Sequence, residues 1–79
     1  MPTPLARARV ASLLFPLDRW DIDGALSWAT TNGYASRKVD VTARYIRLRQ
    51  KDPATFVRGS FRTIHLGDTG VRAIVGRPR

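Results

Sequence analysis

Two segments alternate apolar residues with aromatic and cationic ones, the pattern of a strand that buries one face and exposes the other. The first segment, Val41–Gln50, has the sequence VTARYIRLRQ, and the second, Ser60–Leu66, has the sequence SFRTIHL. Their predicted exposed side chains are Tyr45, Arg47, Arg49, Phe61, Thr63 and His65. Open sheets bind single-stranded nucleic acid with stacking aromatic rings and with cations that follow the phosphates. The pattern therefore favours a phosphate-bearing partner over a small-molecule reaction.

The predicted nucleic-acid site combines residues of both segments. We expect Tyr45 and Phe61 to stack on bases, and the arginines to neutralise phosphates. The full set is Tyr45, Arg47, Arg49, Phe61, Arg62 and His65, with Arg37 and Lys38 at the rim. The faces expected to point toward the core carry Arg44, Ile46, Leu48, Arg62, Ile64 and Leu66. Because Arg62 lies on such a face, it should reach a partner only from a sheet edge.

Two other interpretations of this face remain open. Tyr45 and Phe61 can form a cross-strand aromatic pair that covers the bare face, with arginine stems lying over the rings. The face can also bind a protein, since arginine and aromatic residues dominate interface hot spots and an edge strand can accept a partner strand. One stripe of arginines across Tyr45 and Phe61 would favour nucleic acid, whereas arginines scattered around an apolar patch would favour a protein-interaction module.

The charge of the chain supports a polyanionic partner. Its 79 residues include 14 basic and 6 acidic residues, for a formal net charge of +8. All basic residues except Lys38 and Lys51 are arginines. Charge of this size is typical of proteins that bind nucleic acid or another polyanion. The alternative is the codon usage of a GC-rich genome, because the arginines are spread along the chain and not clustered.

The sequence offers little for catalysis. His65 is the only histidine, it lies in a predicted strand, and the chain has no cysteine. Asp18, Asp21 and Asp23 are close in sequence, but turn and helix-capping roles account for them. No phosphate-binding loop, dinucleotide-binding motif or zinc-protease motif occurs. We therefore expect a protein that is not an enzyme and that uses no metal or other cofactor.

The length and hydrophobicity of the chain predict one small domain. A chain of this size buries roughly 60% of the surface that it exposes when unfolded, so its core must be modest. No apolar run approaches the ~20 residues needed to span a bilayer. The apolar stretch near the N-terminus ends at Pro16 and is too short for a signal peptide. We expect a cytoplasmic protein without a membrane partner.

The first half of the chain predicts a strand and a helix. Val10–Phe15 is apolar and ends at a proline, as expected of a buried first strand. Asp21 is a good N-cap, so the helix should begin just after it. Gly33 should end the helix, because a left-handed glycine satisfies the last carbonyl groups. Tyr34 would then fold back onto the end of the helix, and Trp20 should pack near its start.

The second half predicts three strands. One long strand should run from about Val39 to Gln50 and end before Pro53. Ser60–Leu66 and Val71–Val75 flank the sequence GDTG, which is a strong hairpin signal. With the first strand and the helix, these segments give the element order β-α-β-β-β.

The predicted fold is α+β, with a four-stranded, mainly antiparallel sheet and one helix packed on one face. The expected core residues are Leu14, Ile22, Leu26, Ala29, Ile46, Leu48, Ile64, Leu66 and Ile74. The domain should comprise residues 9–76, between a flexible basic N-terminal tail at 1–8 and a basic C-terminal tail at 77–79.

The run VDVTARYIRLRQKDPATF and the run GSFRTIHLGDTGVRAIVGRP resemble a small domain of tailed-phage and prophage proteins. That domain occurs as short standalone proteins and as an extension of head-module proteins such as prohead proteases. In the first half, LLFP and DIDGALSWATTNGY are similar to its helix and glycine–aromatic turn, so the resemblance spans roughly Leu13–Pro78. Val41 and Thr42 replace acidic residues of the pattern, and Asn32-Gly33-Tyr34 replaces its usual His-Gly-Phe.

The resemblance implies a phage or mobile-element origin and a location in the host cytoplasm. It implies no catalytic residue. It is compatible with a nucleic-acid partner, and equally with a phage head protein to assemble with or a host protein to inhibit. Because the acidic residues of the pattern are missing here, the strong positive charge is a property of this chain more than of the domain.

Overall fold

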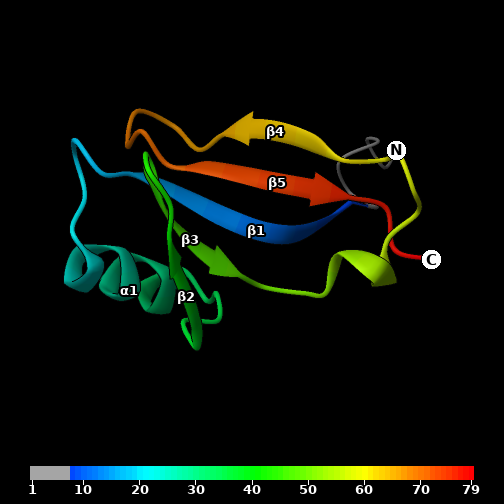
Figure 1. Cartoon of the computed structure of the whole chain (residues 1–79), viewed down its shortest axis with the longest axis horizontal. Helices are drawn as coiled ribbons and strands as arrows, with labels where there is room; N and C mark the ends of the chain where they lie inside the picture. The colour runs from blue at the N-terminus through cyan, green and yellow to red at the C-terminus, as the bar shows by residue number, and fades with distance from the viewer. Residues whose placement is uncertain (1–7) are drawn as a thin grey trace.

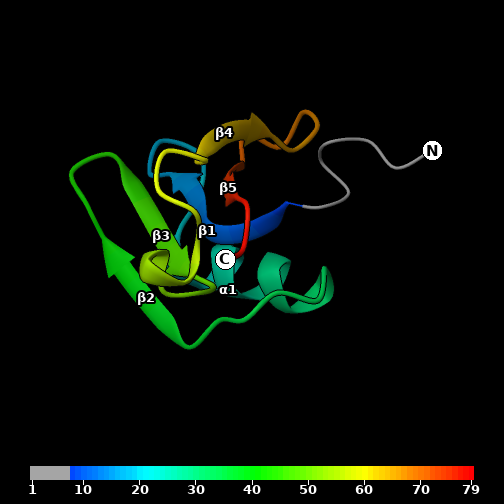
Figure 2. The same cartoon turned by 90° about the vertical axis from the view of Figure 1, so that its right-hand side faces the viewer.

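The computed structural model describes residues 8–79, which form one antiparallel sheet with a helix on one of its faces (Figures 1 and 2). The elements are β1 (Arg9–Pro16), α1 (Ile22–Thr31), β2 (Lys38–Val41), β3 (Tyr45–Arg49), a 3₁₀ turn (Pro53–Thr55), β4 (Arg62–His65) and β5 (Arg72–Gly76). The five strands lie in the order β2-β3-β1-β5-β4. The predicted α+β class with a single helix is confirmed.

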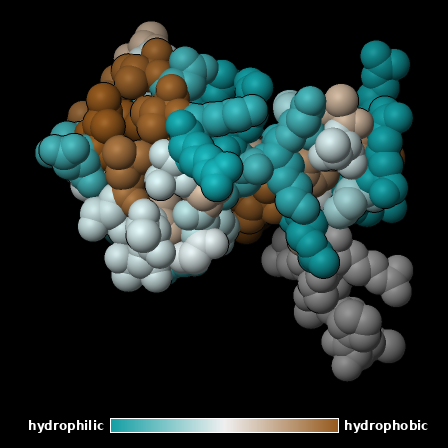
Figure 3. Space-filling view, turned by 90° about the horizontal axis from the view of Figure 1, so that it is seen from below, coloured by the Kyte–Doolittle hydropathy of each residue, from teal (hydrophilic) through white to brown (hydrophobic). Residues whose placement is uncertain are grey.

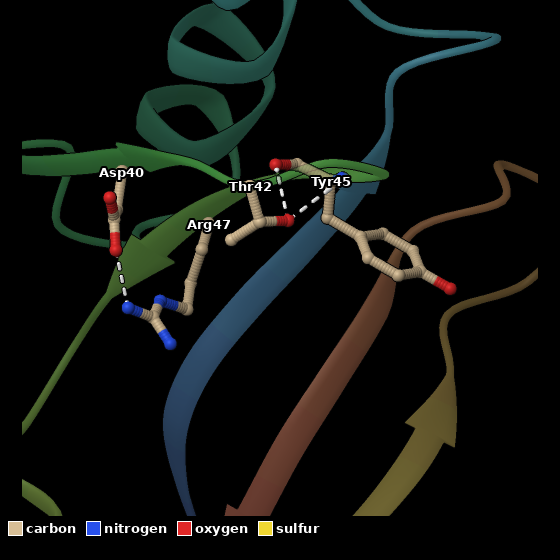
Figure 4. A network of polar contacts seen from close by, with 4 residues as sticks. All are labelled: Asp40, Thr42, Tyr45 and Arg47. Atoms are coloured by element: carbon tan, nitrogen blue, oxygen red, sulfur yellow. Dashed lines mark hydrogen bonds and ion pairs between the residues drawn. The ribbon is translucent and has the colours of Figure 1, made fainter.

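The number of strands differs from the prediction, because the segment expected as one long strand folds into a hairpin. β2 and β3 pair antiparallel and are joined by the turn 42–44. The Thr42 hydroxyl accepts a hydrogen bond from the Tyr45 amide and donates one to the Tyr45 carbonyl, both at 3.1 Å (Figure 4). A threonine side chain thus closes a turn that contains no glycine, proline or asparagine. The sequence carries a weak signal of this turn, because the apolar positions shift from odd numbers at Val39 and Val41 to even numbers at Ile46 and Leu48.

The helix begins and ends where the sequence predicts. An Asp21 carboxylate oxygen accepts a hydrogen bond from the Gly24 amide at 2.7 Å and so caps the first turn. Gly33, with φ at +80°, follows the last turn in the left-handed conformation. Tyr34 then folds back, and its ring stacks on Trp28 with the centroids 5.9 Å apart.

The core lies between α1 and the sheet. Its buried members are Leu13, Phe15, Ala25, Ala29, Ile46, Leu48, Val71, Ala73 and Val75. The two helix residues of this cluster, Ala25 and Ala29, are small, so the helix backbone can approach the sheet closely. Phe15 is fully buried and meets the edges of Trp20 and Trp28, with ring centroids 5.2 and 5.7 Å apart. Trp20 therefore packs against the core near the start of the helix, as predicted.

Three predicted core residues were wrong. Leu14 and Ile74 are only half-buried and lie on the sheet face away from the helix, because Leu13 and Phe15 are the side chains that point toward it. β1 is apolar on both faces, so its alternation could not indicate which face meets the helix. Ile22 begins the helix but is 44% exposed. Among the other predicted core residues, Ala29, Ile46 and Leu48 are fully buried, and Leu26, Ile64 and Leu66 are partly buried against the core.

The C-terminal segment is more ordered than the expected tail. Pro78 forms a β-bridge with Phe56, and the Arg79 amide donates to the Thr55 carbonyl at 2.9 Å. Arg77 also bonds to the loop before β4, through the Ser60 hydroxyl at 3.0 Å. Residues 77–79 thus belong to the folded domain. The expected N-terminal tail lies outside the described residues, except for Ala8, which packs against the core.

Replacing Phe15 with alanine should lower the free energy of unfolding by about 3–5 kcal/mol, because the change leaves a cavity at the centre of the core. Urea denaturation followed by circular dichroism measures this loss. Leu17→Ala is the control, since Leu17 is 41% exposed and its loss should cost about 0.5 kcal/mol or less. Equal losses in the two variants would contradict the core described above.

Candidate functional site

The sheet face opposite α1, named here the open face, carries most of the predicted site residues. Tyr45, Arg47 and Arg49 of β3 lie on it, because Ile46 and Leu48 point to the helix side and are fully buried. One row of the open face crosses all strands, as the register shows: Asp40, Arg47, Leu14, Arg72 and His65. The predicted assignment of faces in β3 is therefore confirmed.

Tyr45 and Phe61 do not meet, so the cross-strand aromatic pair is wrong. β1 and β5 separate their two strands. Tyr45 lies beside Pro16, at one end of the sheet. Phe61 precedes β4 at the opposite end, where its ring lies 5.5 Å from that of Phe56. The two rings also pack over Gly76, whose missing side chain leaves the space that they fill.

At the Tyr45 end of the sheet, an open groove of about 640 Å³ collects cationic side chains. Three arginines line it: Arg19 after β1, Arg44 before β3 and Arg72 in β5. Tyr45 and His65 contribute the remaining polar walls of this arginine groove, together with Asp18. The groove forms here because the register places the ends of β1, β3, β4 and β5 side by side.

Arg72 is held in place from across β1. Its Nη1 atom donates a hydrogen bond of 2.8 Å to the Tyr45 hydroxyl. The guanidinium carbon also lies over the Tyr45 ring, 5.7 Å from its centroid, at a distance that allows a cation–π contact. Figure 4 shows the Tyr45 side chain directed across the sheet, away from the Arg47–Asp40 pair. Tyr45 thus orients a cation of the groove.

Arg19 is held by the hairpin loop between β4 and β5. Gly70 has φ at +80°, and a Cβ atom there would lie 3.2 Å from Arg19 Cδ, so the absence of a side chain admits the arginine stem. The Trp20 indole nitrogen donates a hydrogen bond to the Thr69 carbonyl at 3.0 Å, which links the segment after β1 to the loop between β4 and β5. One wall of the arginine groove is therefore built by two segments that are distant in sequence, 19–20 and 69–70.

The three groove arginines have no ion-pair partner within residues 8–79. The ion pair that the structure records there joins Arg47 to Asp40 on the open face (Figure 4). Asp18 lines the groove but lies beyond ion-pair distance of the basic side chains. Three unpaired guanidinium groups in one concave site create a positive potential, which favours an anion that bridges them.

The structure brings together only part of the predicted set. Tyr45 and His65 share the arginine groove, whereas Phe61 and Arg62 line a different depression near Arg77. Lys38 and Arg49 are neighbours on the open face of β2 and β3, and Arg37 lies just before β2. Arg62 is exposed on the edge strand β4, on the helix side, as expected.

Sequence reasoning missed three groove arginines. Arg44 was predicted to point toward the core, but it belongs to the turn before β3 and is exposed. Arg72 could have been found, since the alternation of β5 places it opposite the buried Val71 and Ala73. Arg19 carries no comparable signal, because its position depends on the contact with Gly70.

Comparison with known proteins gives no relative. No family model matches the sequence, and no curated protein or solved structure is significantly similar to it. Within residues 8–79, no helix has the length and hydrophobicity to cross a membrane. No cluster of three or more histidine or acidic side chains suited to a metal ion occurs in the same residues.

Replacing Tyr45 with phenylalanine should loosen the Arg72 guanidinium without unfolding the domain. The variant loses the hydroxyl that accepts the Arg72 bond, while the ring remains to fill its place. Relaxation of the arginine Nε–Hε signals by NMR measures the effect as a lower order parameter for Arg72. The Arg49 signal is the control and should not change. An unchanged Arg72 signal would show that the hydroxyl does not orient this side chain.

Proposed function

We propose that this protein binds nucleic acid, with phosphates held in the arginine groove and the strand passing over the open face. The observation that carries the proposal is the convergence of Arg19, Arg44 and Arg72, unpaired with carboxylates, on one groove. Guanidinium groups bind phosphate oxygens in a planar, two-pronged geometry. A phosphate in the groove would relieve the repulsion among the three cations.

Tyr45 has a different role in this proposal from the one expected from sequence. Its hydroxyl and its ring are both engaged with Arg72, so it positions a phosphate-binding cation instead of stacking on a base. His65 lies opposite Arg72 on the adjacent strand and supplies a further hydrogen-bonding group at the same end.

The remaining predicted cations extend the positive field around the groove. Lys38 and Arg49 are exposed on the open face and available to a second phosphate. Arg47 contributes less, because Asp40 already neutralises it. Arg37 and Arg62 lie farther from the groove and would act mainly by long-range attraction, which raises the association rate.

The resemblance to small tailed-phage domains fits a binding protein of this kind. We propose on that basis that the protein acts without catalysis, in the cytoplasm of a host cell. The alternative function is that of a protein-interaction module. It is favoured by an exposed apolar area on the helix side of the sheet, formed by Leu17, Ile22, Val39 and Val41.

Binding of labelled single-stranded oligonucleotides across a salt series tests the proposal. The double variant Arg44→Gln/Arg72→Gln should bind more weakly, and the slope of log K against log salt should fall by about 1.4, since each single-strand phosphate contact contributes about 0.7. The matched control is Lys51→Gln/Arg58→Gln, which removes the same charge from two exposed positions that do not line the groove.

The control variant separates a site from a general charge effect. If both variants lose the same slope and affinity, the protein attracts nucleic acid only through its net charge. If the groove variant binds like the wild type, the groove does not hold phosphates. Duplex oligonucleotides in the same series indicate which form of nucleic acid the open face prefers.

A further inference from the structure

An apolar area lies on the helix side of the sheet, next to the edge strand β2. Its exposed members are Leu17, Ile22, Val39 and Val41, with 41%, 44%, 38% and 53% of their surfaces exposed. Figure 3 shows an apolar surface on the side of the molecule where α1 and β2 lie. Leu17, Ile22 and Val41 border a groove of about 390 Å³, and Asp21 and Asp23 stand at its rim. These four apolar residues are named here the β2 patch.

The backbone of β2 is also unpaired on its outer side. The Thr42 amide donates to the Tyr45 carbonyl, so Thr42, Asp40 and Lys38 direct their backbone groups toward β3. Backbone groups alternate along a strand, and therefore those of Val39 and Val41 point away from the sheet. β2 is the last strand on this side of the sheet. A free edge beside exposed valines is a site at which another strand can pair.

We propose that the occupant of this edge is a second copy of the chain, paired antiparallel through β2. In such a dimer the two sheets join into one, related by a twofold axis. Residues that pair across the junction must then have their side chains on the same face of the joined sheet. Centred on Val39, such a pairing places Lys38 of each copy opposite Asp40 of the other, whose carboxylate also pairs with Arg47 of its own chain. Centred on Asp40, it would bring two carboxylates face to face, which is unfavourable. The sequence KVDV is thus complementary to itself in one register.

The same register also gives hydrogen-bond partners to the outward backbone groups of β2 and a cationic partner to the acidic residues beside the β2 patch. Val39 of each copy has its amide and carbonyl directed outward, so the two valines can exchange a pair of hydrogen bonds about the axis. Arg37 of one copy falls opposite Val41 of the other, near the carboxylates of Asp21 and Asp23. The contact is therefore complementary in charge although each chain is strongly basic, and it covers exposed valines on both copies.

Association measured by sedimentation velocity over a concentration series tests this interface, with no nucleic acid present. Val39→Pro removes the outward amide but no bond to β3, so it should raise the dimer dissociation constant by roughly tenfold or more. The matched control is Thr63→Pro in the other edge strand, β4. Its amide also points outward, because the neighbouring ladder bond runs from the Leu66 amide to the Val71 carbonyl. It should leave dimerisation unchanged.

Charge reversal gives a second test that does not depend on proline. Lys38→Asp and Asp40→Lys should each abolish the homodimer, since each places like charges opposite one another. Mixed together, the two variants should form a heterodimer, because every pair in the proposed register is then complementary. Native mass spectrometry distinguishes the species by mass.

Three results would overturn the proposal. The first is a wild-type chain that stays monomeric at every concentration. The second is a folded Val39→Pro variant that associates as tightly as the wild type. The third is a mixture of the charge-reversed variants that forms no heterodimer.

Discussion

The central strand β1 and the helix that covers it hold the domain together. β1 pairs with β3 on one side and β5 on the other, and its Leu13 and Phe15 side chains are completely buried beneath α1. A chain of this size has little apolar surface to bury, and it has no cysteine with which to cross-link its folded state. Its stability therefore depends on this one layer of contact, to which the other elements attach.

Because α1 covers only one face of the sheet, the open face is exposed and carries many of the charged side chains. Antiparallel pairing brings the turn after β1, the turn before β3 and the β4–β5 loop to the same end of the sheet. Arginines from these distant segments then share a groove, and bonds such as Tyr45–Arg72 and Trp20–Thr69 fix its walls. The groove is a consequence of the topology, since no short stretch of the chain contains it.

The hairpin of β2 and β3 gives the molecule a second, different surface. Because the chain turns at Thr42, β2 becomes an edge strand whose valines remain exposed. The arginine groove lies among the loops at one end of the sheet, whereas the β2 patch lies on the helix side of the sheet. The two surfaces share only Leu17 among their lining residues, so they differ in both chemistry and position.

The sequence by itself determined the local features of this protein. Asp21 and Gly33 set the limits of the helix, GDTG set a hairpin, and the alternation around Ile46 and Leu48 set the two faces of β3. These features depend on interactions between residues that are near one another in the chain, or on a simple contrast between apolar and polar positions. They can therefore be inferred from spacing.

Tertiary structure decided the rest. Only strand order could show that Tyr45 and Phe61 lie at opposite ends of the sheet, and only packing could choose between the two apolar faces of β1. The arginine groove depends on contacts between residues as far apart as Arg19 and Gly70. Such contacts leave no periodic signal in the sequence, because each residue's position is set by partners that the chain reaches only after it has folded.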